Sequence, residues 1–176
     1  MIMEADLERL NSVLKQHLAG LDDTQTQATP DVRGKWSIQQ IVEHLLLTYR
    51  ATIAVMQTRV DKRTPTQAKP TAAQRLGQWM VIGVGRFPFG RPSPEAVCPS
   101  PQPAACTGEE LAHRVQTELL RLDALAVEAE ALFGTRRSIS HMLLGPLSVP
   151  QWRRFHLVHG QHHAKQIRAI RSQRSL

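Results

Sequence analysis

The sequence predicts an all-α protein, a bundle of four long helices with an additional short helix and a long proline-rich loop. Two observations favour this class. Apolar residues recur every three or four positions over most of the chain, the period of a helix with one buried face. Strand signals are nearly absent, because no convincing run of alternating β-branched residues stands between turn residues. Long helices joined by links of several residues pack as a bundle.

Four capping boxes mark where helices begin. In each, a Ser or Thr is followed three residues later by a Glu or Gln, and each side chain can bond a backbone N–H of the other residue. The pairs are Ser37 with Gln40, Thr71 with Gln74, Thr107 with Glu110, and Ser148 with Gln151. Because each pair precedes an apolar-periodic segment, a helix is expected to start after each first residue.

These starts and the apolar stripes predict the extent of each element. Helices are expected at Ala5–Leu21, from Ile38 past Met56, at Ala72–Val84, after Thr107 to Phe133, and at Val149–Arg171. The links are a basic stretch, 62–70, and a connection, 135–147. The proline-rich loop covers 85–106 and contains six prolines, which exclude a continuing helix.

Length and composition bound the protein class. A chain of 176 residues fits one domain, so a single domain over residues 1–176 is expected. The acidic N-terminal segment is unlike a secretory signal, and the longest apolar run, 79–84, is too short to span a membrane. We therefore expect a cytoplasmic protein in which Cys98 and Cys106 are reduced thiols.

Half of the eight histidines lie in one short stretch of the last helix: His156, His159, His162 and His163. At about 100° per residue these four positions face one side, which they share with apolar residues. A buried histidine needs a hydrogen-bond partner, and several charged ones repel each other. A metal ion satisfies both conditions because neutral imidazoles donate lone pairs to it.

Two of these histidines, His159 and His163, are spaced i, i+4 and can aim at one point. His44, beside the apolar stripe of the second long helix, is the best candidate for a third ligand. The alternative is a group of core histidines satisfied by their neighbours. A peptidase of the His-Glu-x-x-His type is excluded because Gly160 stands at the position of its glutamate.

Several of these residues together resemble a known family. Trp36-Ser37 opens the helix that carries His44, and Gly145-Pro146-Leu147 precedes the helix with Trp152 and Phe155. That helix continues as His159-x-x-His162-His163-x-x-Gln166-Ile167. This pattern is similar to the DinB-like superfamily, and more closely to a bacterial branch of it classed as a domain of unknown function.

The resemblance implies a four-helix bundle, often a homodimer, with one divalent metal ion. By position, the three ligands that it implies are His44, His159 and His163. Members bind zinc, nickel, iron or manganese, so the resemblance leaves the ion open. They include thiol-dependent transferases and isomerases, which implies a small-molecule substrate, possibly a thiol.

The leading hypothesis is a metal-dependent enzyme of transferase or hydrolase type, because three protein ligands leave a position open for water or a thiol. His162, Gln166 and His156 are candidates for groups that support the ligands or relay protons. The loop 85–106 is a candidate cover for the site, with Arg86 or Arg91 meeting an anionic substrate.

Two alternatives stay open. One is a non-catalytic interaction module that the metal stabilises. The other, less favoured, is nucleic-acid binding through the basic residues of the last helix, since the net charge is +7 but aromatic content is only 5%. Trp36, Trp152 and Phe155 are expected to be core residues rather than groups that stack on a substrate.

Overall fold

The computed structural model describes residues 3–32, 34–87 and 93–176. Five α-helices are present in these ranges: α1 (Ala5–Leu18), α2 (Ile38–Lys62), α3 (Ala72–Gln78), α4 (Gly108–Phe133) and α5 (Val149–Arg174). Shorter elements lie between them: the 3₁₀ turns η1 (Gln25–Gln27) and η3 (Glu95–Val97), the π-helical turn η2 (Trp79–Gly83), and the strands β1 (Ile139–His141) and β2 (Gly145–Leu147). The all-α class is confirmed.

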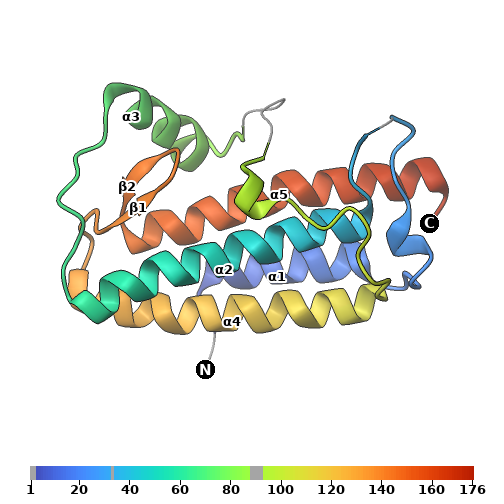
Figure 1. Cartoon of the computed structure of the whole chain (residues 1–176), viewed down its shortest axis with the longest axis horizontal. Helices are drawn as coiled ribbons and strands as arrows, with labels where there is room; N and C mark the ends of the chain where they lie inside the picture. Colours follow the sequence, from blue (N-terminus) through green and yellow to red (C-terminus); the bar gives the residue numbers. More distant parts are fainter. Residues whose placement is uncertain (1–2, 33, 88–92) are drawn as a thin grey trace.

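The four long helices lie side by side, as Figure 1 shows, and α3 stands with the β-hairpin at one end of the bundle. Helix α2 packs mainly against α4, and α5 packs mainly against α1. Leucines spaced along α1 form one wall of the core, and Leu7, Leu10, Leu14 and Leu18 are fully buried. Their spacing of three and four residues is the stripe visible in the sequence.

All four capping boxes form as expected. In α2, α3, α4 and α5 the Ser or Thr side chain accepts from the third backbone N–H, and the Gln or Glu side chain accepts from the cap N–H. Helix ends were harder to predict. Helix α1 ends at Leu18 rather than Leu21, because Gly20 adopts a positive φ of 75°.

The structure contains a small sheet, for which the sequence carries almost no signal. Strands β1 and β2 form an antiparallel hairpin in which Ile139 faces Leu147. Each strand has only three residues, and no alternating pattern can appear over so short a length. Side chains from neighbouring helices hold the hairpin instead: Gln78 Nε2 donates to the Leu144 carbonyl at 2.7 Å, and Trp152 Nε1 donates to the Ile139 carbonyl at 3.2 Å.

The short helix also differs from the expected 72–84. Its α-helical part stops at Gln78, and the chain continues as the π-helical turn η2, closed by a 2.9 Å bond from the Val84 N–H to the Trp79 carbonyl. Apolar spacing over a single turn does not distinguish an α from a π turn, so the sequence carried no signal for the change.

Close packing of α1 against α5 depends on Gly160. A Cβ at this position would overlap the side chain of Leu10. The lack of a glutamate here, which excluded the peptidase, therefore also has a packing reason. No helix in the described ranges is both long enough and apolar enough to cross a membrane.

Candidate metal centre

Three histidines from two helices meet in the bundle. His44 comes from α2, and His159 and His163 come from α5. The Nε2 atoms of His44 and His159 are 3.3 Å apart, and those of His159 and His163 are 3.0 Å apart. One nitrogen from each ring lies within 4.8 Å of the other two. The structure thus brings together the three residues that the sequence singled out.

The outer nitrogens of two rings are already engaged. Nδ1 of His44 donates to the carbonyl oxygen of Val97 at 2.8 Å, and a carbonyl can only accept. Nδ1 of His163 lies 2.8 Å from Oε1 of Gln166, which likewise accepts. A neutral imidazole carries one proton, so both rings present a bare lone pair at Nε2. An outer acceptor of this kind is common for metal-bound histidines.

Without a cation, His159 cannot form hydrogen bonds through Nε2 to both His44 and His163. Its Nε2 carries at most one hydrogen, which can bond to only one of the other two rings. Its Nδ1 is buried and has no hydrogen-bond partner in the part of the chain that the structure describes. A divalent ion among the three Nε2 atoms would accept all three lone pairs, and imidazole suits zinc, iron and nickel. The donor set therefore fits a metal.

Burial keeps the three rings neutral. Their exposed fractions are 4% for His44, 5% for His159 and 6% for His163. Burial lowers the pKa of His163 to about 3, with a further lowering from the neighbouring His44. Burial is the main cause that lowers the pKa of His159, and the neighbouring histidines lower it further. Burial also lowers the pKa of His44, although its hydrogen bond to Val97 acts in the opposite direction. The lone pairs are thus available at neutral pH.

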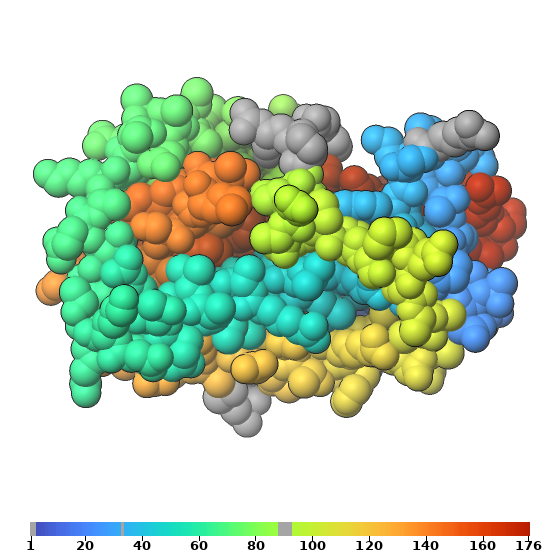
Figure 2. All heavy atoms as spheres, viewed as in Figure 1, coloured from blue at the N-terminus to red at the C-terminus, as the bar shows by residue number. Residues whose placement is uncertain are grey.

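Two residues of the proline-rich loop contact this centre, one near its start and one near its middle. The ring of Phe87, just after η2, stacks on His159 at a centroid distance of 4.7 Å. Val97, the last residue of η3, bonds His44. Figure 2 shows the segment that includes η3 (yellow-green) against α2 (cyan) and above α5 (red). Residues on both sides of 88–92 therefore contact the centre, and a covering role for the whole loop stays a prediction. Arg86 is exposed, and Arg91 lies outside the described residues.

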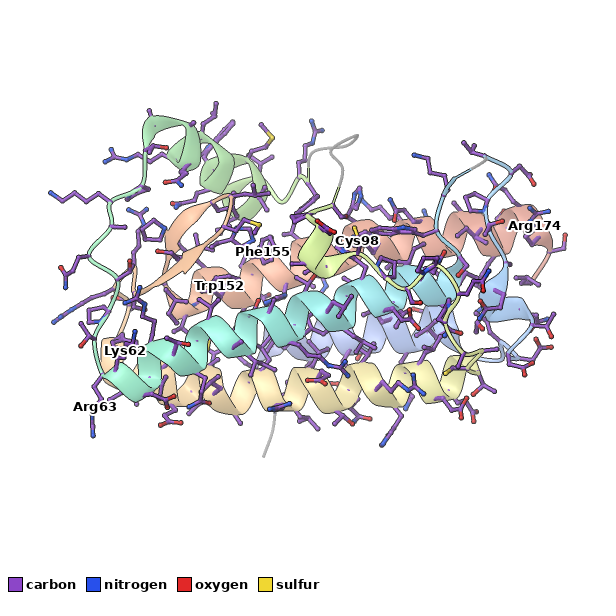
Figure 3. All side chains as sticks on the ribbon, viewed as in Figure 1. Lys62, Arg63, Cys98, Trp152, Phe155 and Arg174 are labelled. Carbon is purple, nitrogen blue, oxygen red and sulfur yellow. The ribbon has the colours of Figure 1, made fainter. Side chains whose placement is uncertain are left out.

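Aromatic residues form the other walls. Phe155 stacks on His159 at 5.5 Å, and Trp36 lies 5.0 Å from the His44 ring. Figure 3 shows Phe155 and Trp152 on α5. Trp152 and Phe155 are buried, as expected for core residues, whereas Trp36 is only partly buried. Phe155 and Trp36 contact the candidate ligands as well as the core.

The three supporting candidates have different surroundings. Gln166 bonds His163, as described above, and its amide nitrogen lies 3.3 Å from Nε2 of His162. His162 is half-buried, and its ring is 5.4 Å from that of Phe87. His156 is fully buried among Trp152, Phe155 and Tyr49. Neither of its ring nitrogens has a hydrogen-bond partner in the described ranges.

The sequence did not identify Val97 or Phe87 as residues of the site. Val97 acts through its backbone carbonyl, to which the residue type gives no clue, and Phe87 lies in a segment without periodicity. His141 lies in β1, where its ring centroid is 4.5 Å from that of Phe155, and it does not join the triad. The cysteines also stay apart: Cys98 is exposed, Cys106 is buried, and both are free.

Several basic residues of α5 are already paired. Arg153 is buried and forms ion pairs with Asp123 and Glu130. Arg171 donates to the carbonyls of His17 and Ala19. The two carboxylates offset the charge of Arg153, whereas Arg171 keeps its full charge, so the free positive charge along α5 on which nucleic-acid binding would depend is reduced only in part.

Comparison with known protein families identifies the family of this chain. The sequence model of the DinB superfamily matches residues 6–167. No curated protein and no solved structure matches the chain significantly. The matched range includes all three histidines of the centre.

Proposed function

Because the chain belongs to the DinB superfamily, we propose that it is a metal-dependent enzyme whose divalent ion is held by His44, His159 and His163. The ion leaves one position open for water or a thiol, and the reaction is of transferase or hydrolase type. The substrate is a small molecule, possibly a thiol.

One observation carries this proposal: three buried Nε2 atoms converge within 4.8 Å, and two of their rings have the Nδ1 proton held by an oxygen. Such an arrangement is costly without a cation, because lone pairs would face each other in a site that excludes water. No cysteine or carboxylate from the described ranges joins the three histidines. A three-ligand site of this kind is typical of catalytic rather than structural zinc.

The chain's own residues have distinct parts in this scheme. A bound divalent ion lowers the pKa of a coordinated water or thiol and so supplies a nucleophile near neutral pH. Val97 and Gln166 hold two rings in the required tautomer. Phe87 and Phe155 pack on His159 and keep water from its ring. His162, half-buried beside Gln166, is the candidate for proton transfer at the rim.

The first test is metal content. We would measure it by elemental mass spectrometry on untagged protein and on His44→Ala, His159→Ala and His113→Ala variants. His113, an exposed residue of α4, is the matched control. About one ion per chain in the wild type and in the control, and loss in the other two, supports the site. A wild type that cannot be loaded with zinc, nickel, iron or manganese would refute it.

A metal-stabilised interaction module is the second candidate, and the packing favours it. Helices α2 and α5 each pack mainly against another helix, so a shared ion would tie them together. Cobalt(II) substitution separates the two candidates. An open position predicts that 2-mercaptoethanol adds a sulfur-to-cobalt absorption band, whereas a closed sphere predicts an unchanged spectrum.

A further inference from the structure

A surface groove lies apart from the three histidines. It has a volume of about 500 Å³, which falls within the usual range for small-molecule sites. Its lining includes Arg75, Gln78, Trp79, Ile82, Arg137 and Gln151. Gln151 precedes His159 by eight residues on α5, a distance of about 12 Å along the helix axis. No histidine of the metal centre lines this groove.

Two arginines give the groove its charge. Arg75 comes from α3, and Arg137 comes from the link between α4 and β1. No acidic residue lines the groove, and within the described ranges neither arginine forms an ion pair. A planar guanidinium binds carboxylate and phosphate oxygens through paired hydrogen bonds. Two of them on one groove favour an anionic ligand.

The groove also offers an apolar surface. Trp79 is 63% exposed although it is among the largest apolar side chains of the protein. Ile82, one turn later, is partly buried on the same element. An exposed indole provides a flat face on which another ring can stack. The ligand that fits both features has an acidic group and a flat apolar part.

Hydrogen bonds of Gln78 and Gln151 hold the walls of the groove in place. Nε2 of Gln78 donates to the carbonyls of Leu144 and Pro146, which joins α3 to the hairpin. Oε1 of Gln151 accepts from the Ser148 N–H in the cap of α5, so its Nε2 is left to donate. The groove is therefore preformed, which lowers the entropic cost of binding.

We propose that this groove binds a small organic anion, an aromatic carboxylate or aryl phosphate. Arg75 and Arg137 hold its acidic group, and its ring stacks on Trp79. The site is separate from the metal centre and does not depend on the function proposed above.

The test uses the full chain without metal and calorimetric titration with phenyl phosphate. Saturable 1:1 binding is expected, about tenfold weaker in Arg75→Gln and in Arg137→Gln, which corresponds to about 1.4 kcal/mol each. Trp79→Ala should weaken phenyl phosphate and leave inorganic phosphate unchanged. Benzoate, titrated in parallel, shows whether the groove prefers a carboxylate or a phosphate.

The matched control is the double variant Arg9→Gln/Arg114→Gln, which removes the same charge from exposed positions on α1 and α4. It should bind phenyl phosphate like the wild type. Equal weakening in this control and in Arg75→Gln/Arg137→Gln would overturn the proposal, because the effect would then be one of net charge. Loss of binding in His159→Ala would also overturn it, by locating the anion at the histidines. So would a lack of saturable binding of either probe by the wild type.

Discussion

Nε2 of His44 lies 3.3 Å from Nε2 of His159, although 115 positions separate the two residues in the chain. They belong to α2 and α5, and each of these helices packs mainly against another one. The contact between the rings is therefore not a by-product of tight packing between α2 and α5. It is the kind of approach that a shared ligand would stabilise.

Gln166 should control metal affinity through His163. Gln166→Leu removes the oxygen that accepts from Nδ1 of His163, and loss of such an outer partner typically weakens metal binding about 10–100-fold. Competition with a chromophoric chelator measures the change. Gln166→Glu keeps an acceptor oxygen and should retain most of the affinity. Gln161→Ala, on the same helix, is the control, and an equal loss there would argue against a specific role.

Gly160 should be intolerant of a larger residue. In Gly160→Ala the added Cβ overlaps Leu10, and overpacking costs about 1–3 kcal/mol, of which higher helix propensity returns about 1 kcal/mol. We expect a net loss of up to about 2 kcal/mol in the free energy of unfolding, measured in urea on metal-free protein. In a Leu10→Ala background the same change should cost nothing. Additive effects of the two substitutions would contradict the contact.

Much of the fold was predictable because its signals are local. Each capping box is a signal of only four residues that marks where a helix begins, and all four boxes form in the structure. The clustering of His159 and His163 follows from helical spacing alone. His44 was harder, since it lies on another helix. Its place beside the apolar stripe of α2 made it the best candidate, and the resemblance to a family implied the same residue.

The remaining features had no local signal. The hairpin depends on bonds from Gln78 and Trp152, which lie outside it. Val97 supports His44 through a backbone carbonyl, a group that every residue possesses. Phe87 contacts His159 from an irregular segment, where no periodic pattern of apolar residues predicts the path of the backbone. These contacts depend on tertiary structure, and sequence spacing does not encode them.

Phe87 should slow the loss of a bound metal ion. Its ring stacks on His159, and an aromatic contact contributes about 0.5–1.5 kcal/mol. Phe87→Ala should therefore raise the rate of zinc release to a chelator roughly two- to tenfold. Val84→Ala shortens a nearby residue that is 48% exposed and should leave the rate unchanged. Equal rates in the two variants would show that Phe87 does not protect the site.

His156 should make the metal-free protein less stable in acid. Burial, with a smaller contribution from His141, lowers its pKa to about 3 from the ordinary value of 6.5. Between these values the unfolded chain binds a proton that the folded chain does not, so stability falls as the pH decreases below 6.5. Well below 6.5 this residue alone contributes about 1.4 kcal/mol per pH unit.

Urea unfolding of metal-free protein at several pH values from 7.5 to 4.5 measures this slope. His156→Leu replaces the ring by an apolar group and should give a shallower dependence on pH than the wild type. The residual slope reflects the other buried histidines, whose pKa values are also lowered. Parallel curves for wild type and His156→Leu would mean that His156 is protonated, or reached by water, in the folded protein.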